Sequence, residues 1–393
     1  MLTSFKVKAF KSLENVEIEL GRVNVFIGAN GSGKSNLLEA IGILGAAANG
    51  RVDDEALLRR GVRPGLPVLY KSSFKNTQQP KQIQLTAENE GALFSVGLLN
   101  PLGKPEPAWQ FKTEKLEEGK QKIVGRSPAS KLRLEAGLSA LKAVELPIDS
   151  PASNLLEDLR QFAFFSPDTA TLRGLDTDPQ SREPVGLSGG RLAEAIDTVF
   201  TSNNKKIWHE DVNIYRSAIN LIGWAEGLAS SGPGSVPVSK NIFQPNRILR
   251  FTDRYMASGR NILSGYDASE GALYVLFMIA LVHHPESPSI LAVDNFDHAL
   301  NPRLARELTR KICDWTMMYK NRQLLLTSHN PLVLDGLPLQ DDRVRLFTVE
   351  RSHAGKTLVS RVKVDEKLIE QAKNGVPLSQ QWVMGTFGGV PQI

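Results

Sequence analysis

The sequence predicts an α/β protein built on a phosphate-binding loop, and three observations lead to that fold class. An apolar run over residues 22–27 enters the segment GANGSGKS, Gly28–Ser35, and a helix-type run leaves it. Two later apolar runs each end in a polar side chain, at Asp294 and at His329. Buried strands with polar residues at their carboxyl ends are typical of a parallel sheet with a ligand site along one edge.

The segment Gly28–Ser35 fits the pattern G-x-x-x-x-G-K-[ST] in the strand-to-helix context that gives the pattern its meaning. Glycines let backbone N–H groups turn inward around a phosphate, and the helix N-terminus adds a positive field. We expect Lys34 to reach the β- and γ-phosphates of ATP and Ser35 to ligate Mg²⁺. The residues expected to contact the nucleotide here are Asn30, Gly31, Ser32, Gly33, Lys34, Ser35 and Asn36.

Composition favours a soluble, cytoplasmic protein. The chain has 393 residues, 41% of them hydrophobic, and one cysteine, so no internal disulfide can form. The first residues alternate like a strand and lack the apolar core of a signal peptide. The longest apolar run, residues 272–282, is much shorter than the roughly 20 residues that span a bilayer. No membrane association is therefore expected.

Positive charge is in modest excess and unevenly distributed. The net charge is +5, and residues 71–133 alone carry 11 Lys and Arg against 6 Asp and Glu. A second cluster comprises Arg247, Arg250, Arg254 and Arg260. Such clusters are either solvated surface or a contact for nucleic acid, so DNA binding is possible but not required.

The first half of the chain predicts strands, one helix and then a sheet. Residues 2–10, 16–20 and 22–27 are predicted as strands, and the helix after the loop is expected to run to about Ala48. Proline, glycine and asparagine separate short strands typical of an antiparallel sheet, predicted over 68–74, 81–87, 92–98, 109–113 and 121–124. Residues 152–230 are predicted to be mostly helical, over 152–163, 190–203 and 207–229. Without sustained heptads, a long coiled-coil arm is not expected.

From residue 265 the pattern becomes regular α/β. Helix 269–283 is apolar nearly all round and should be buried. A strand over 290–294 ends in Asp294, and Asn301 with Pro302 predicts the start of the next helix. Strand 323–328 ends at His329, a strand pair is expected over 345–350 and 358–364, and the tail from 365 to 393 adds a short helix.

Two strand ends supply the groups that a phosphate loop needs. Asp294 is expected to serve the Mg²⁺ ion, and His329 to hydrogen-bond the γ-phosphate or the attacking water. A capping aspartate and an ordinary loop histidine are the structural alternatives.

Taken together, these segments resemble the ABC-type ATPase heads of the RecF/SMC-like branch, often named simply AAA family ATPases. The chain is also similar to compact ATPases of the OLD-like group and of anti-phage defence systems such as Septu and PARIS. The residues that carry this resemblance are 10–12, 28–41, 269–271, 292–302 and 327–331. The resemblance implies an ABC-type head, with a mixed sheet around the phosphate loop, an antiparallel β-subdomain and an inserted, largely helical lobe.

The resemblance also implies a division of the chain. The N-terminal half of the head is expected over 1–90 and an inserted β/helical lobe over 91–260. The C-terminal half of the head, with the signature, the Asp294 strand and the switch histidine, is expected over 261–350. A C-terminal strand and tail follow over 351–393.

In this family two heads sandwich two ATP molecules, which implies a homodimer or higher oligomer with composite sites. Ser269, Glu270 and Gly271 match the signature that faces the γ-phosphate in trans, and Lys11 matches a further nucleotide contact. The run Leu187–Arg191, LSGGR, is closer to a transporter signature, but it lies too far before Asp294 and is interpreted as a glycine-rich helix start.

One position departs from the family pattern. Asn295 stands where a catalytic glutamate normally follows the aspartate. An amide cannot usefully accept a proton, and loss of a positioned base costs about 10²–10⁴ in rate. Asp297, His329 or a partner chain are the possible substitutes. We therefore expect weak ATPase activity, or binding with little turnover.

These features favour an ATP-gated sensor or scaffold that controls a separate effector, a nuclease or toxin, in anti-phage defence. No nuclease constellation is visible in the sequence, so any cutting would come from another chain. The alternative is a RecF-like DNA-binding ATPase in repair. A transporter motor fits less well, and a purely structural ATP-binding protein remains open if turnover is absent.

Overall fold

Strand β3 (Val23–Ile27) lies in the middle of the sheet that leads into the phosphate loop, and all five of its residues are buried. The computed structural model describes residues 1–128, 134–201, 214–232, 234–239, 245–363, 368 and 375–389. Its core sheet has the order β15-β14-β3-β13-β12-β8. The other strands of this sheet are β8 (Ala163–Phe165), β12 (Ile290–Val293), β13 (Gln323–Ser328), β14 (Val344–Arg351) and β15 (Thr357–Val362).

Four strand pairs of the core sheet are parallel, and this places three loop starts at one edge. β3 pairs in parallel with β13 and β14, and β12 pairs in parallel with β13 and β8. Gly28, Asp294 and His329 follow the carboxyl ends of β3, β12 and β13, so all three lie along the same edge of the sheet. The antiparallel β15 makes the sheet mixed, as predicted.

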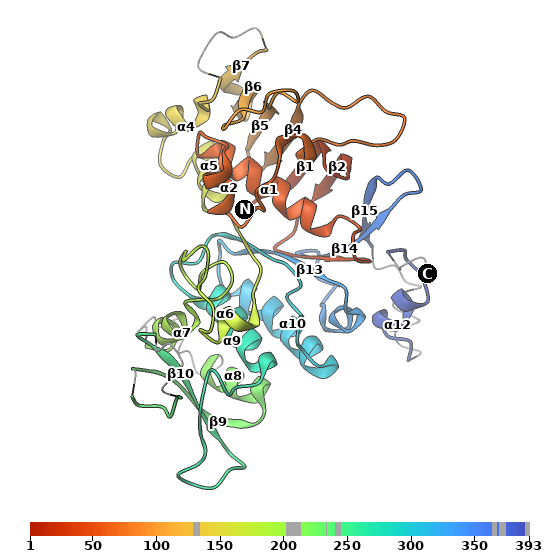
Figure 1. Ribbon diagram of the computed structural model, residues 1–393. Helices are drawn as coiled ribbons and strands as arrows, with labels where there is room; N and C mark the ends of the chain where they lie inside the picture. The colour runs from red at the N-terminus through yellow and green to blue at the C-terminus, as the bar shows by residue number, and fades with distance from the viewer. Residues whose placement is uncertain are drawn as a thin grey trace.

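A second, antiparallel sheet stands above the core sheet in Figure 1, with the order β2-β1-β4-β5-β6-β7. Its strands are β1 (Ser4–Phe10), β2 (Leu13–Glu19), β4 (Ile83–Glu88), β5 (Ala92–Leu99), β6 (Gln110–Glu118) and β7 (Gln121–Arg126). Helices α1 (Lys34–Ala48) and α5 (Pro151–Gln161) share one hydrophobic core with this sheet. The domain boundary expected at residue 90 falls between β4 and β5, which are neighbours in this sheet.

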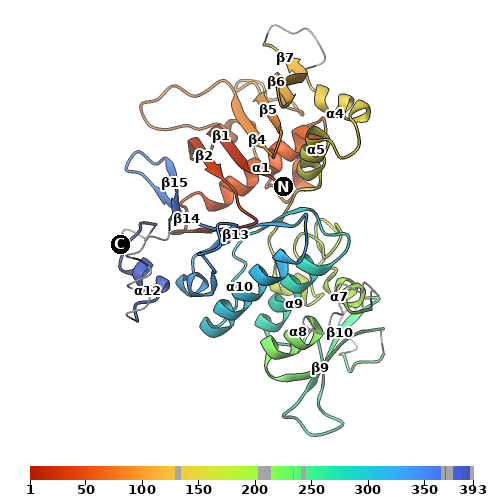
Figure 2. The same cartoon turned by 180° about the vertical axis from the view of Figure 1, so that it is seen from behind.

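A group of helices and a small sheet form the lower part of the molecule (Figures 1 and 2). The sheet has the order β11-β10-β9, made of β9 (Ala225–Ser231), β10 (Ile248–Asp253) and β11 (Ile262–Ser264). The helices there are α6 (Thr169–Leu172), α7 (Leu192–Thr201), α8 (Ile214–Ile222), α9 (Glu270–His283) and α10 (Pro302–Met317). The short helices elsewhere are α2 (Asp54–Leu58), α3 (Pro67–Tyr70), α4 (Leu138–Lys142), α12 (Leu378–Val383) and two 3-10 turns, Ala143–Glu145 and Pro331–Gly336.

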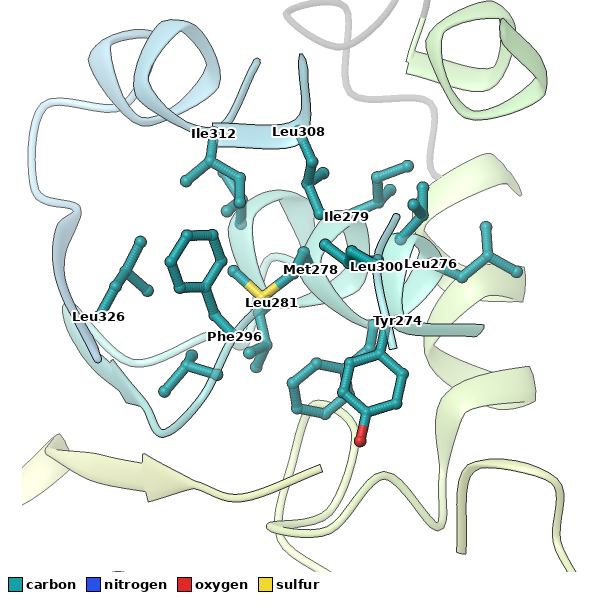
Figure 3. Packing of buried hydrophobic residues seen from close by; sticks show 14 of the residues in the cluster. Tyr274, Leu276, Met278, Ile279, Leu281, Phe296, Leu300, Leu308, Ile312 and Leu326 are labelled. Atoms are coloured by element: carbon teal, nitrogen blue, oxygen red, sulfur yellow. The ribbon is translucent and has the colours of Figure 1, made fainter. Parts of the chain in front are cut away.

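Helix α9 forms the centre of this lower core, because every residue from Ala272 to His283 is buried. Figure 3 shows Phe296, Leu308, Ile312 and Leu326 directed toward it. Cys313 belongs to the same cluster and is 1% exposed. The all-round apolar pattern therefore predicted the burial of this helix correctly, and its burial fixes where its N-terminus lies.

Three local predictions were wrong. Residues 67–70 form helix α3 rather than the start of a strand, since Pro67 stands at its first turn. The helix predicted over 207–229 ends at Ile222, and residues 225–231 form β9, while 207–213 lie outside the described residues. The stretch predicted as helix 152–163 ends at Gln161, and residues 163–165 form β8 at the edge of the core sheet.

Within the described residues, no helix is both long and apolar enough to cross a lipid bilayer.

Candidate functional site

The phosphate loop connects β3 to α1 and is packed tightly against its neighbours. Gly31 and Gly33 have φ angles of +76° and +111°, a region where side chains other than glycine are strained. A Cβ atom on Gly28 would lie 2.0 Å from the carbonyl oxygen of Val349 in β14. The glycines at 28, 31 and 33 are therefore required by close approach and by backbone conformation.

Two groups of the loop are arranged to receive an anion. Lys34 Nζ donates to the carbonyl oxygens of Gly28 at 2.8 Å and Ala29 at 3.0 Å, so its ammonium lies across the concave side of the loop. Burial lowers the pKa of Lys34, although Asp294 and Asp297 oppose that shift. Ser32 Oγ is buried and has no hydrogen-bond partner among the described residues. A phosphate group would satisfy both side chains.

Ser35 and Asp294, the two residues expected to ligate Mg²⁺, lie together in the structure. Ser35 Oγ is 2.9 Å from Oδ2 and 3.1 Å from Oδ1 of Asp294. Hydroxyl and carboxylate oxygens are the donors that Mg²⁺ prefers, so the pair fits the ion that accompanies ATP. Ser35 and Asp294 are the residues that would hold the ion, which would supply neutralisation of phosphate charge.

Thr327, on the neighbouring strand β13, hydrogen-bonds Asp294 of the Ser35–Asp294 pair. Its hydroxyl donates to Oδ1 of Asp294 and accepts from the backbone N–H of Asn295 at 2.9 Å. Thr327 is fully buried in β13. It therefore fixes both the carboxylate and the backbone of the next residue.

A hydroxyl cluster joins the loop to the turn between β1 and β2 and to the start of β15. Thr357 Oγ1 lies 2.7 Å from both the carbonyl oxygen of Ser32 and Oγ of Ser12. Asn36 Nδ2 donates to Ser12 Oγ at 2.8 Å. Asn36, expected to contact nucleotide, is thus engaged within the protein in this structure.

Lys11 is also engaged within the protein. Its ammonium pairs with Glu39 at 2.5 Å, and Arg63 pairs with the other oxygen of that carboxylate at 2.6 Å. The Glu39 side chain is fully buried, so these two cations compensate its charge. The Lys11 ammonium also lies 5.1 Å from the Tyr70 ring centroid. The Lys11 side chain is 20% exposed, whereas its partner Glu39 is fully buried.

The three residues expected to act on water differ in environment. Asn295 has φ +48°, which asparagine tolerates better than most residues. Asp297 is 5% exposed, its Oδ1 lacks a partner among the described residues, and burial raises its pKa against the opposing effects of Ser328 and His329. His329 is exposed at the end of β13. Asp297 is therefore an electrostatic neighbour of both Lys34 and His329.

The signature residues Ser269, Glu270 and Gly271 make their contacts within the lower part of the molecule. Ser269 precedes α9 without capping it, and its hydroxyl accepts from the indole Nε1 of Trp224 at 3.2 Å. The hydroxyl of Thr169 donates to Glu270, and a Cβ on Gly271 would lie 3.3 Å from the carbonyl oxygen of Ala299. The contacts of this triplet thus go to α6, Trp224 and Ala299, and not to the loop Gly28–Ser35 of the same chain.

The LSGGR run is used internally. The carboxylate of Asp178 accepts from the backbone N–H groups of Ser188 at 2.9 Å and Gly190 at 3.1 Å. Helix α7 begins directly afterwards at Leu192. The run is a glycine-rich helix start, as predicted, and a carboxylate of the same chain already occupies its N–H groups.

Comparison with known proteins identifies the family of this chain. Residues 23–335 match the family described as "AAA domain, putative AbiEii toxin, Type IV TA system". The match covers most of the chain, and the protein belongs to this family of AAA ATPases. The prediction of an AAA family ATPase is confirmed by this match.

Solved structures of SMC heads are similar at low sequence identity. The SMC head domain from Thermotoga maritima is 14% identical with a TM-score of 0.45, over 92% of this chain and 99% of that one. An Smc head from Pyrococcus furiosus, bound to the C-terminal domain of ScpA, is 14% identical with a TM-score of 0.47, over 95% and 98% of the two chains.

Sequence reasoning missed four contributors to the site: Glu39, Trp224, Thr327 and Thr357. Glu39 could have been noticed as a carboxylate inside an apolar helix pattern. Thr327 lies two residues before His329, in a run already singled out. Trp224 and Thr357 carry no local signal, because only the fold brings them to Ser269 and to the loop.

Proposed function

We propose that this chain is a slowly hydrolysing ABC-type ATPase that uses ATP to join two heads and thereby controls a separate effector. The observation that carries the proposal is the Ser35–Asp294 pair at the phosphate loop, with Asn295 directly after it. The pair supports Mg²⁺–ATP binding, and the amide beside it supports slow turnover. ATP that is bound but slowly consumed suits a switch better than a motor.

Assembly through ATP is supported by the position of the signature. Ser269 is exposed at the N-terminus of α9, and its contacts lie away from the phosphate loop of its own chain. A second copy could present this hydroxyl and helix end to a γ-phosphate, which would complete the site with charge-complementary groups. The composite dimer is therefore the arrangement in which both halves of the site are used.

The effector is proposed to be a nuclease or toxin on another chain, in defence against phage. Among the described residues, no group of three or more His, Cys, Asp or Glu side chains is placed to hold a metal ion. The family match to a toxin-linked AAA domain supports this role. The protein would act in the cytoplasm as a sensor or scaffold.

The test is ATP-dependent assembly of the purified chain. Light scattering after size-exclusion chromatography should detect a dimer or higher oligomer with Mg²⁺–ATP but not with ADP, and Lys34→Ala should abolish it. A wild-type chain that binds no ATP, or whose mass is identical with and without ATP, would disprove the proposal. Co-purification of a neighbouring gene product with ATP would identify the effector.

A DNA-binding ATPase of the RecF kind is the second candidate, favoured by the excess of positive charge over residues 71–133. It predicts salt-sensitive binding to duplex DNA that strengthens when ATP is added. Gel-shift titrations at several salt concentrations would separate it from the first proposal.

A further inference from the structure

The loop between β10 and β11 is an exposed segment outside the candidate site described above. All residues from Arg254 to Arg260 are exposed, with Tyr255 78% and Met256 50% exposed. The loop carries two arginines and an aromatic ring but no carboxylate. The nearest acid, Asp253, accepts the backbone N–H of Tyr255 at 2.7 Å. Cations and an aromatic ring together are suited to a nucleotide's phosphates and base.

Trp224 connects this loop to Ser269. Its indole N–H donates to Ser269 Oγ at 3.2 Å, and its ring packs on Phe251 of β10 with centroids 5.3 Å apart. Its carbonyl oxygen accepts the backbone N–H of Arg254 at 3.2 Å, where the loop begins. The side chain of Arg254 then donates to the carbonyl oxygen of Ala225 at 2.7 Å.

These contacts join the signature hydroxyl and the loop through one residue. We infer that Trp224 is a positioning residue for Ser269, and that the loop Arg254–Arg260 adjoins the ATP carried by a second copy of this chain. The inference rests on the proposed function, because it assumes that Ser269 meets the nucleotide of the partner. Beyond the proposed function, Trp224 would orient the Ser269 hydroxyl, and the loop Arg254–Arg260 would form the surface next to the nucleotide.

The charge of the loop and the hydrogen-bonding capacity of Ser269 both fit the ATP of a second copy. A serine hydroxyl that accepts from an indole still has its own proton to donate, so Trp224 leaves the Ser269 proton available for a phosphate oxygen. Arg254, whose backbone N–H bonds the carbonyl oxygen of Trp224, and Arg260 give positive charge to the loop that Trp224 joins to Ser269, and positive charge favours an anion. In Figure 1 β10 lies at the lower end of the molecule, and β7 lies at the opposite end.

Three variants test the inference by the dissociation constant of the ATP-bound dimer, measured by analytical ultracentrifugation. Trp224→Phe keeps the ring on Phe251 and removes the N–H. A Ser269 hydroxyl that is no longer positioned should lose its bond to the partner's phosphate, and at about five-fold per neutral hydrogen bond in each of two sites this weakens the dimer by up to about 25-fold. Arg260→Glu should weaken it at least about ten-fold at low salt and less at high salt. Lys120→Glu, an exposed reversal in the turn between β6 and β7, should leave it unchanged.

A double-mutant cycle shows whether Trp224 acts through Ser269. In a Ser269→Ala background, Trp224→Phe should add little, because the hydroxyl it positions is gone. A role in lobe stability alone would give the same loss in both backgrounds, which would overturn the inference. ATP affinity of the monomer is measured in parallel, and the effect on the dimer must exceed the effect on that affinity.

Other results of these measurements separate a failure of the inference from a failure of the proposed function. If the wild type forms an ATP-dependent dimer while Trp224→Phe and Arg260→Glu match it, the inference fails and the proposed function stands. If Arg260→Glu dimerises normally but loses DNA binding, the loop is a nucleic-acid surface and the inference is also overturned. If the wild type binds no ATP or never dimerises, the proposed function fails first.

Discussion

The hydroxyl of Ser35 lies 2.9 Å from Oδ2 of Asp294, although 259 residues separate them in the chain. Parallel pairing of β3 with β13, and of β13 with β12, brings their loops to one edge and makes this contact possible. The two side chains belong to the first and the last thirds of the sequence. Their meeting shows that segments far apart in the sequence form one candidate site at the edge of the core sheet.

Replacing Ser35 by alanine, or Asp294 by asparagine, should separate Mg²⁺-dependent from Mg²⁺-independent nucleotide binding. Each change removes one oxygen ligand or one charge, so ATP affinity with Mg²⁺ should fall about ten-fold or more, about 1.4 kcal/mol. Affinity in EDTA should change much less. Isothermal titration with and without Mg²⁺ measures both, and an equal loss in the two conditions would contradict the assigned role.

Asn295→Glu should raise the rate of ATP hydrolysis by restoring a base, by up to about 10²–10⁴. It should also cost about 1 kcal/mol of stability, because residue 295 has φ +48° and glutamate tolerates that conformation less well than asparagine. Phosphate release and thermal melting measure the two effects. Asn295→Gln is the matched control, with similar strain and no base. A wild type as fast as ordinary ATPases, with no gain on substitution, would disprove the account.

Thr327→Val should destabilise the protein by about 1–3 kcal/mol and weaken Mg²⁺–ATP binding, since it leaves the Asn295 N–H without its partner and removes one of the two hydroxyls that contact Oδ1 of Asp294. Thr327→Ser keeps the hydroxyl and should lose much less of both. Chemical denaturation and nucleotide titration test the pair. Equal losses for the two variants would mean that the methyl group, not the hydroxyl, is what matters.

His283 should make stability depend on pH in the acid range. Burial lowers the pKa of His283 to about 3 from 6.5, with Arg322 adding to the shift. The unfolded chain therefore takes up a proton below pH 6.5 that the folded chain refuses. Stability from this group is complete above pH 6.5 and falls by about 1.4 kcal/mol per pH unit between 6.5 and 3.

The His283→Gln variant isolates that dependence. Free energies of unfolding from urea titrations at pH 7.5 and 5 should differ more in the wild type than in the variant, by up to about 2 kcal/mol. The variant loses a hydrogen bond to Tyr319, which lowers its stability at both pH values alike. Parallel pH curves for the two proteins would rule out His283 as the source.

Local sequence pattern predicted the elements that carry the nucleotide site. The motif Gly28–Ser35, the apolar runs before Asp294 and His329, and the cap at Asn301 each report a strong local preference, and the structure has those elements where they were expected. Because parallel strands end at the same edge, the meeting of Ser35 and Asp294 followed from these patterns as well.

Tertiary contacts decided what the local pattern could not. Residues 163–165 are too short to show a strand period, and they become β8 only because β12 offers its open edge. The run 67–70 satisfies strand composition, yet Pro67 starts a helical turn instead. Trp224 reaches Ser269 across 45 residues, and no spacing rule in one sequence could indicate that hydrogen bond.

The burial of Cys313 has a practical consequence for spectroscopy. The thiol is the only one in the sequence, it is 1% exposed, and burial raises its pKa to about 12. The native chain should therefore resist maleimide reagents, whose target is the thiolate. A cysteine introduced on an exposed position such as Lys120 could be labelled without first removing Cys313. Energy transfer between two such labels would then follow, in real time, how two chains approach each other after ATP is added.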